Sequence, residues 1–147
     1  MGYIQVCVRF NASHPARLKV SDFAFAQNLP ETNGSVYDGK VVMLINEDAI
    51  SQAEHTALFF EAARPDITFI GTPTMGANGD VTVMVLPGNL GVSFSGHSVR
   101  HADGRRLQRL GIQPTVSAAP TVRGIAEGRD EILEAAIKFL QSNPVKQ

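Results

Sequence analysis

The sequence predicts an α/β fold with a mixed sheet, because short apolar runs typical of strands alternate with segments typical of helices. Residues 40–46 form a near-continuous apolar run, rich in β-branched side chains and too short for a helix, which predicts a central strand covered on both faces. Residues 51–63 are strongly helix-forming and end at Arg64-Pro65. Residues 129–141 combine an apolar stripe with acids in the first turn, which predicts a closing helix.

The remaining segments complete this pattern. Residues 3–10 alternate between apolar and polar side chains and predict a strand, whereas 11–38 are polar, contain several turn residues and predict irregular structure. A long irregular connection is usually functional or a sign that part of a domain is missing. Further strands are expected at residues 66–70, 81–86 and 90–99, a glycine-punctuated loop at 71–79, a turn at Asp103-Gly104, and a loop into a short edge strand at 111–116.

Length and composition indicate one folded domain over residues 1–147. Hydrophobic residues make up 44% and charged residues 18% of the chain, so it can bury a core and is not a disordered tail. The formal net charge is -1 and the Lys and Arg residues are scattered, which gives no electrostatic footprint for nucleic acid or anionic lipid. No apolar run approaches the ~20 residues of a membrane span and no export signal precedes the first strand, so we expect a soluble chain.

The cysteine and histidine residues do not indicate a disulfide or a metal site. Cys7 is the one cysteine and lies in the alternating run at 3–10, so we expect a buried strand thiol. His97 and His101 lie four residues apart in an expected loop without further ligands at suitable spacing, which makes a poor zinc site. We therefore expect no metal and no cofactor.

Ser51 is the first candidate for chemistry. It follows a strand and begins a helix, and ligands bind at this position in open α/β sheets. The backbone N–H groups of Ser51 and Gln52 are unpaired at such a helix start and are suited to stabilise an oxyanion. On local physics alone, the alternative is that Ser51 simply caps the helix.

A series of motifs resembles serine peptidases of the tail-specific, or C-terminal processing, family. In residues 41–54 an apolar strand ends in Asn-Glu and leads to the nucleophilic serine three residues before a glutamate, here Ser51 before Glu54. The later motifs occur in the family's order over roughly residues 36–141: Gly71-Thr72-Pro73-Thr74-Met75-Gly76, Leu86-Pro87-Gly88, Asp103-Gly104-Arg105, Gly111-Ile112-x-Pro114, and Leu133-Glu134-Ala135-Ala136 in the closing helix. Residues 39–141 thus form the family-like core, and 1–38 match poorly.

The resemblance implies a fold of the Clp protease and crotonase group, with stacked β-β-α units forming part of a domain, and hydrolysis of peptide bonds in peptide or protein substrates. It implies Ser51 as nucleophile and the Gln52 N–H as oxyanion donor. The family's catalytic lysine would stand at Ala77, and the glutamine that orients it at Val81. A Ser-Lys dyad is therefore not expected here.

Histidines are the remaining candidates for the general base. A related branch, similar to the tricorn core protease, takes a histidine from upstream of the nucleophile domain. His55 lies one helical turn after Ser51 and points back along the helix, where it can hardly reach an attacking hydroxyl, so we expect a satisfied or solvated helix residue. His97 and His101 flank a loop and are the candidate bases, with surface imidazoles as the alternative.

These observations leave several functions open. The chain is either a serine peptidase fragment, with a base from a loop histidine, another subunit or an absent segment, or an inactive peptidase-like module that binds a peptide or apolar ligand. A crotonase-like acyl transferase ranks lower, because no acyl-CoA loop is recognisable. The family's upstream Asp-Leu-Arg-x-Asn-x-Gly-Gly stretch and its usual PDZ domain are not found in residues 1–38, so we expect a fragment or a divergent member. A truncated sheet would leave edges uncovered, which favours a homo-oligomer, and the compartment stays open.

Overall fold

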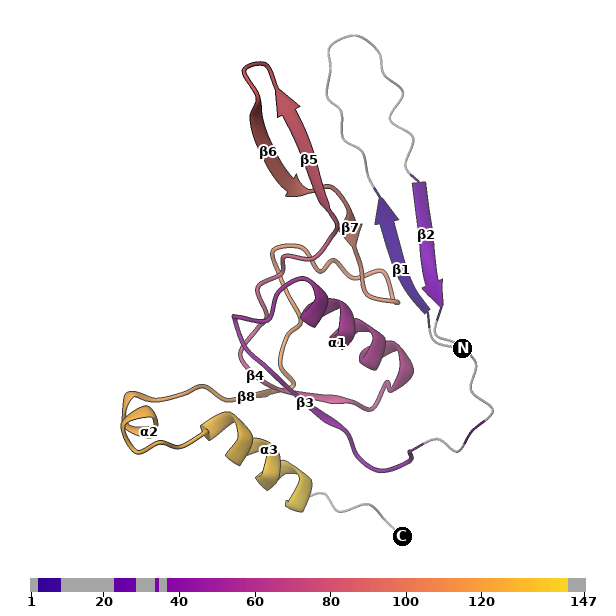
Figure 1. Cartoon of the computed structure of the whole chain (residues 1–147). Coiled ribbons are helices and arrows are strands. Elements are labelled where there is room, and N and C mark those ends of the chain that lie inside the picture. The colour runs from indigo at the N-terminus through magenta and orange to yellow at the C-terminus, as the bar shows by residue number, and fades with distance from the viewer. Residues whose placement is uncertain (1–2, 9–22, 29–33, 35–36, 143–147) are drawn as a thin grey trace.

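The structure is a computed structural model that describes residues 3–8, 23–28, 34 and 37–142. In it, small sheets and helices are arranged around one buried core (Figure 1). Its elements in chain order are β1 Tyr3–Val8, β2 Phe23–Asn28, β3 Val42–Ile45, α1 Gln52–Ala63, β4 Thr68–Gly71, β5 Val81–Leu86, β6 Leu90–Ser95, β7 Ser98–Val99, β8 Val116–Ser117, α2 Val122–Ala126 and α3 Glu131–Ser142.

A parallel sheet of order β3-β4-β8 carries the site. Val42 pairs with Thr68 at one end of the β3–β4 ladder and Ile45 with Gly71 at the other, while β8 adds to the far side of β4. Helices α1 and α3 lie on opposite faces of this sheet (Figure 1). Among the described residues β3 is an edge strand and β4 the central one, so the expectation of a central strand at 40–46 is wrong. An apolar run indicates that a strand packs against the core, but it does not show how many strands are hydrogen-bonded to it. Leu44 is 42% exposed, so the strand is not covered on both faces along its whole length.

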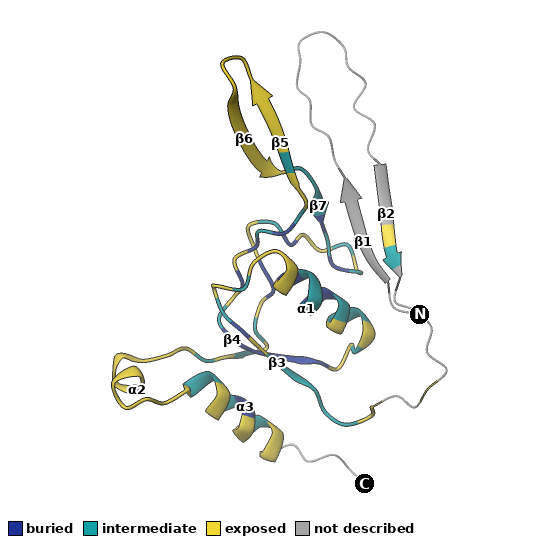
Figure 2. Cartoon of the chain, in the orientation of Figure 1, coloured by how far each residue is buried: buried dark blue, intermediate teal, exposed yellow. Residues whose placement is uncertain are grey.

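The core lies between α1 and the parallel sheet, where dark-blue segments meet in Figure 2. Helix α1 contributes Ala57 and Leu58, and the segment after the hairpin adds apolar side chains of its own. The buried cluster consists of Ile45, Ala57, Leu58, Ile67, Phe69, Val99, Leu107 and Ile112. Because these residues come from β3, α1, β4 and the segment after the hairpin, the core packs β3 and α1 against each other.

Gly71 ends β4 and turns the chain into the loop at 71–79. Its φ is 139°, a conformation that side chains rarely adopt, and a Cβ at this position would lie 1.8 Å from the carbonyl oxygen of Ile45. Thr72 continues the contact by donating its N–H to the same oxygen at 3.1 Å. A glycine is therefore required where the loop leaves the sheet.

A second sheet, of order β2-β1-β7, is antiparallel. Strand β2 falls within the segment for which irregular structure was expected, so that expectation is wrong for Phe23–Asn28. The alternation Phe-Ala-Phe-Ala is a strand signal, but the polar, proline-containing sequence on both sides hides it. Cys7 lies in β1 opposite Ala24 and Ser98, while its side chain is outside the described residues, as is the rest of the 11–38 segment apart from 34 and 37–38.

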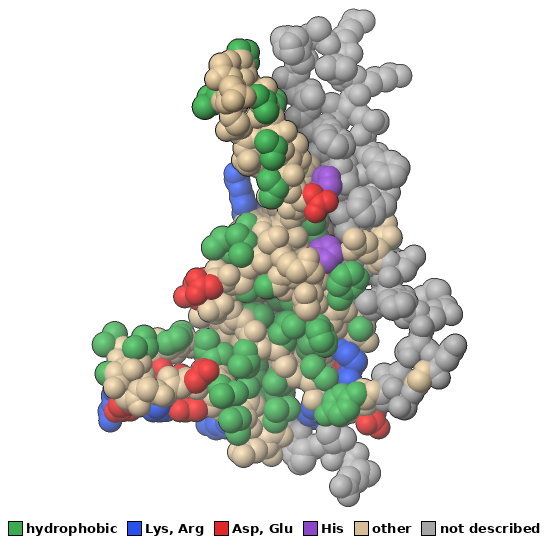
Figure 3. All heavy atoms as spheres, viewed as in Figure 1, with side chains coloured by type: hydrophobic (Ala, Val, Ile, Leu, Met, Phe, Trp, Pro, Cys, Tyr) green, Lys and Arg blue, Asp and Glu red, His purple; other side chains and the backbone are tan. Residues whose placement is uncertain are grey.

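The hairpin β5–β6 projects from the body (Figure 1). Its register places Met84 opposite Val92 and Leu86 opposite Leu90 on one face, and apolar side chains appear along it in Figure 3. Every residue of the two strands except Thr82 is exposed, and no charged residue occurs from Val81 to Ser95. The single strand expected at 90–99 is two strands, because the chain turns at Gly96-His97 between β6 and β7.

The C-terminal part confirms the expected closing helix as α3 and adds the short helix α2, which the sequence did not indicate. Thr121 caps α2 by accepting a hydrogen bond from the Gly124 N–H at 2.9 Å. Glu131, at the start of α3, accepts hydrogen bonds from the Thr121 backbone N–H and hydroxyl. No helix of the described ranges is long and apolar enough to span a bilayer.

Candidate active site

Ser51 precedes α1 in a conformation that a simple helix cap does not need. Its φ of 54° and ψ of −111° lie outside the regions that L-residues favour, and its side chain makes no capping hydrogen bond. The capping alternative therefore does not describe this serine. Strained backbone of this kind costs about 1–3 kcal/mol and clusters at active sites. The residue is exposed, so it is accessible from solvent.

Two backbone bonds hold this turn. The Ser51 N–H donates to the carbonyl oxygen of Ala77 at 3.0 Å, and the Ser51 carbonyl accepts from the His55 N–H at 2.9 Å. Of the two N–H groups expected to face an oxyanion, that of Ser51 is thus engaged. The Gln52 N–H is in the first turn of α1 and has no acceptor among the described residues. It is the N–H that remains for a developing negative charge.

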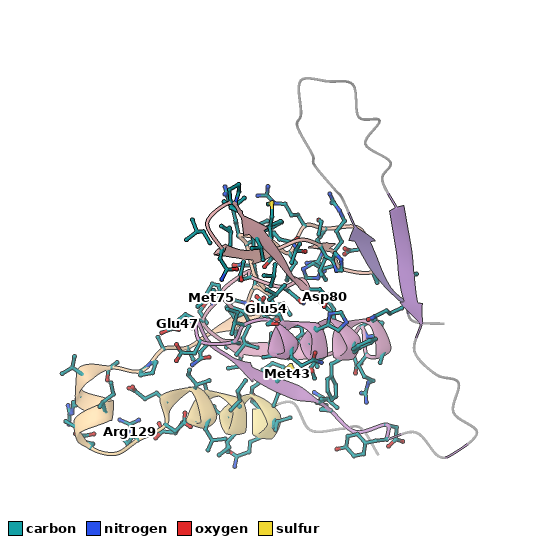
Figure 4. The ribbon with its side chains drawn as sticks, turned by 45° about the horizontal axis from the view of Figure 1, so that its top comes forward. Met43, Glu47, Glu54, Met75, Asp80 and Arg129 are labelled. Atoms are coloured by element: carbon teal, nitrogen blue, oxygen red, sulfur yellow. The ribbon has the colours of Figure 1, made fainter. Side chains whose placement is uncertain are left out.

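Glu54 joins α1 to the loop at 71–79 from within the core. Its side chain is fully buried and accepts three hydrogen bonds: from the Thr74 hydroxyl at 2.5 Å, from the Gly76 N–H at 2.7 Å and from the Ala77 N–H at 3.0 Å. Figure 4 shows Glu54 between the helix and this loop, with Met75 beside it. Thr74 also accepts from the Ile112 N–H at 2.8 Å, so the segment at Ile112 is linked to Glu54 through Thr74.

The outer rim of the site combines a carboxylate with apolar side chains. Glu47 accepts a hydrogen bond from the Thr72 hydroxyl at 2.6 Å, and this bond is the main cause that holds the pKa of the Glu47 carboxyl below its ordinary value. The Met75 N–H donates to the carbonyl oxygen of Ala49 at 3.1 Å, which ties the loop to the residues before Ser51. Met75 and Ile50 are exposed by 52% and 45%, so the rim offers apolar surface.

His55 is a satisfied helix residue, as the sequence suggested. Its Nε2 lies 2.6 Å from Oε1 of Gln27, and its Nδ1 lies 3.5 Å from the Asn78 side-chain nitrogen. The ring also makes an edge contact with Phe59 at 5.1 Å between centroids. Burial lowers the pKa of His55, and the nearby charge of Asp80 opposes this only in part.

The two loop histidines have acidic partners. His97 Nδ1 lies 3.2 Å from Asp80 Oδ2, and His101 Nδ1 lies 2.5 Å from Glu61 Oε2. No hydrogen bond among the described residues joins either imidazole to Ser51. Glu61 lies ten residues after Ser51, about 15 Å along α1 at the helical rise. In the view of Figure 4, Glu47 and Met75 lie on one side of Glu54 and Asp80 on the other.

Sequence reasoning did not find the role of Glu54, although the residue was part of a motif. A signal was present, because Glu54 shares the helix face of Ala57 and Leu58 at spacings of three and four residues, and these two are core side chains. A carboxylate on an apolar face requires hydrogen-bond partners.

In the described part of the chain, no group of three or more His, Cys, Asp or Glu side chains is placed to hold a metal ion.

The parallel sheet, the helix on each face and the strained serine at the strand-to-helix turn define a mixed α/β core of the Clp protease and crotonase type, as expected from the sequence. The chain belongs to peptidase family S41, whose sequence profile matches residues 6–118. This match includes part of the N-terminal segment that the motifs left out and ends before α2 and α3. The resemblance to C-terminal processing peptidases is thereby confirmed at the level of the family.

Solved structures with the same fold support this assignment. A candidate peptidase from Parabacteroides merdae aligns at 25% identity with a TM-score of 0.67, over 95% of this chain and 42% of that one. Mature CPAF aligns at 21% identity and 0.57 over 72% and 21%, and the photosystem II D1 C-terminal processing protease at 18% and 0.54 over 83% and 29%. The chain therefore spans less than half the length of each of these structures. No curated protein matches it in sequence.

Proposed function

We propose that the chain supplies the nucleophile of a serine-type peptidase, with Ser51 attacking the scissile carbonyl carbon. The observation that carries the proposal is the strained turn of Ser51, an exposed residue whose side chain makes no capping bond and which is followed by Gln52 with an unengaged N–H. In the reaction, the Ser51 hydroxyl proton passes to a base while the Gln52 N–H stabilises the oxyanion. Collapse of this intermediate releases the amine with that proton, and water then hydrolyses the acyl-serine.

The base in this proposal is His97 or His101 within the described residues, or a group on another segment or subunit. His97 has a carboxylate partner in Asp80, which is the arrangement that orients a catalytic imidazole. His101 is 3% exposed and its Nδ1 is bonded to Glu61, so it would need a rearrangement to act. His97→Ala and His101→Ala distinguish the two candidate bases, because loss of the true base lowers kcat by orders of magnitude.

A fluorophosphonate probe tests the nucleophile directly. We expect labelling of the wild-type protein that is abolished in Ser51→Ala, while Ser95→Ala, in the exposed hairpin, labels like the wild type. Absence of labelling in a folded protein would refute the proposal.

Tail specificity is part of the proposal and has its own test. Cleavage should be faster for a peptide with a free C-terminal carboxylate than for the same peptide amidated at that end.

One observation favours a second function, an inactive peptidase-like module that binds a peptide. Ala77 occupies the place expected for the family's lysine and offers only a methyl group beside Ser51, while its backbone groups are bonded to Glu54 and Ser51. For this function, isothermal titration should detect peptide binding that Ser51→Ala leaves unchanged, without turnover of the peptide. Turnover that requires Ser51 would exclude it.

The exposed hairpin β5–β6 supports the expected self-association. Its uncharged, apolar strands are uncommon on a monomer surface, and within the described ranges they pair only with each other. Light scattering should report a mass above that of one chain, and Val83→Lys should reduce it without loss of the fold, since Val83 is 64% exposed.

A further inference from the structure

Glu54 is the most deeply buried carboxylate of the described residues, and the reaction proposed above gives it no step. From the bonds that it accepts, we propose that Glu54 is the positioning residue that fixes the reactive turn of Ser51 by holding the backbone of Ala77. The inference rests on the proposed function for its catalytic consequence. Its structural half, the control of the Ser51 turn, is tested separately.

The chain of contacts runs from the core to the serine. The two carboxylate oxygens of Glu54 divide their donors: Oε1 accepts from Thr74 and Gly76, and Oε2 accepts from the Ala77 N–H. The carbonyl of the same residue, Ala77, accepts the Ser51 N–H at 3.0 Å. One peptide segment thus faces Glu54 with its N–H and Ser51 with its C=O, and a shift at the first contact is transmitted to the second.

Burial makes this link stiff. Glu54 is 0% exposed and Thr74 6% exposed, so water does not compete for the bonds that the Thr74 hydroxyl and the Gly76 N–H donate to Glu54. Thr74 is itself held on both sides, because its hydroxyl donates to Glu54 and accepts from the Ile112 N–H. The positive φ of Ser51 is a conformation that persists only when its surroundings over-determine it. The bonds from Thr74, Gly76 and Ala77 to Glu54 constrain the Ser51 backbone from the loop at 71–79. Helix α1 constrains it through the bond from the His55 N–H to the Ser51 carbonyl.

A role confined to stabilising the fold would predict something different. Glu131 provides the comparison, since it also accepts from a threonine hydroxyl and a backbone N–H, both of Thr121, but lies in α3. If Glu54 acts only as a clamp between segments, Glu54→Gln and Glu131→Gln should both lower stability and leave the Ser51 backbone unchanged. If it positions Ser51, the two substitutions should differ at Ser51.

The test uses Glu54→Gln and hydrogen exchange of single amides. With the glutamine oxygen in the place of Oε1, the bonds to Thr74 and Gly76 persist, while the amide nitrogen faces the Ala77 N–H as donor to donor. We expect the Ser51 amide to exchange at least tenfold faster than in the wild type, after correction by the β4 amides that report global opening. We expect the rate constant of fluorophosphonate labelling at Ser51 to fall at least tenfold. Glu131→Gln should change neither.

Each outcome decides the inference. Unchanged exchange at Ser51 in folded Glu54→Gln overturns it, and faster exchange with an unchanged labelling rate overturns its catalytic half. If wild type does not label at all, the proposed function fails, whereas the exchange result still decides whether Glu54 holds the turn. If Glu54→Gln does not fold, Thr74→Val removes at similar volume the hydroxyl that donates to Glu54 and accepts from the Ile112 N–H, and it should accelerate Ser51 exchange. Thr74→Ser, which keeps the hydroxyl, should restore the wild-type rate. Equal exchange in these two variants overturns the inference.

Discussion

The Ser51 N–H donates to the carbonyl oxygen of Ala77, so the serine that we propose as nucleophile is bonded to the residue in the place expected for the family's lysine. The two residues lie 26 positions apart in the sequence, but their backbones are 3.0 Å apart at this bond. A longer side chain at position 77 would therefore start from a residue whose backbone is hydrogen-bonded to that of Ser51. The bond also explains why one of the two expected oxyanion donors is engaged.

Ala77→Lys should raise the reactivity of Ser51. The new amine would start from a partly buried backbone position, and partial desolvation lowers the pKa of a lysine towards the range of a general base. We expect fluorophosphonate labelling at Ser51 to accelerate at least tenfold, with a rate that increases with pH as the amine loses its proton. Ala77→Met has a similar length and no titratable group, so it is the matched control and should label like the wild type. Equal rates in the two variants would contradict the expectation.

Stability should fall as the solution is made mildly acidic, because of His55. Burial holds the pKa of this imidazole below its ordinary value of 6.5, so the unfolded chain binds a proton at a higher pH than the folded chain does. The contribution of His55 to the free energy of unfolding is therefore complete above about pH 6.5 and decreases as the pH falls below it. Urea unfolding at several pH values measures the slope of the free energy of unfolding against pH.

His55→Gln isolates that contribution from the other histidines. Glutamine can still donate to Gln27, whose oxygen lies 2.6 Å from His55 Nε2, but it does not titrate. We expect the variant to lose part of the slope between about pH 7 and pH 5.5. A slope identical to that of the wild type would mean that His55 has the same pKa in the folded and unfolded chains.

Glu61 should contribute to stability at neutral pH through His101 and Arg105. Burial favours a raised pKa for this carboxyl, but the hydrogen bonds from His101 at 2.5 Å and Arg105 at 2.7 Å outweigh it and lower the pKa below the ordinary value of 4.5. Because the pKa of Glu61 is lower in the folded chain than in the unfolded chain, its contribution to the free energy of unfolding is present above about pH 4.5. This contribution is lost as the pH falls through the pKa of the folded chain. Glu61→Gln should cost about 1.5–3 kcal/mol at pH 7, from the loss of charged hydrogen bonds.

Chemical denaturation at pH 7 checks this value, and Glu127→Gln is the control. Glu127 pairs with Arg123 one helical turn away at 2.7 Å, but both side chains are exposed. Such pairs contribute about 0.3–0.5 kcal/mol. A Glu61→Gln cost as small as that of Glu127→Gln would show that the buried imidazole does not strengthen the pair.

The sequence predicted the elements with strong local signals and the family, but it did not predict the contacts that organise the site. The helix at Gln52–Ala63 and the loop at 71–79 follow from composition and glycine spacing. The bonds of Glu54 join positions 20 to 23 residues apart, and the Ser51 N–H donates to Ala77 in a distant loop, so neither set of contacts follows from a local pattern. Strand β2 was missed because Phe23–Asn28 is short and lies between turn-rich segments.

Gly71→Ala tests whether the loop at 71–79 must leave the sheet as the structure has it. A methyl group at position 71 would lie 1.8 Å from the Ile45 carbonyl oxygen, and the φ of 139° is unfavourable for any residue with a side chain. Relief requires movement of the β3–β4 ladder, whose last pair is Ile45 with Gly71. We expect a loss of more than about 2 kcal/mol in the free energy of unfolding. Gly91→Ala is the control, since a Cβ there meets no atom within 4 Å and φ is not positive, and it should cost less than about 1 kcal/mol. Similar costs for the two variants would mean that the loop can leave β4 by another path, and that the position of Ala77 beside Ser51 does not depend on this glycine.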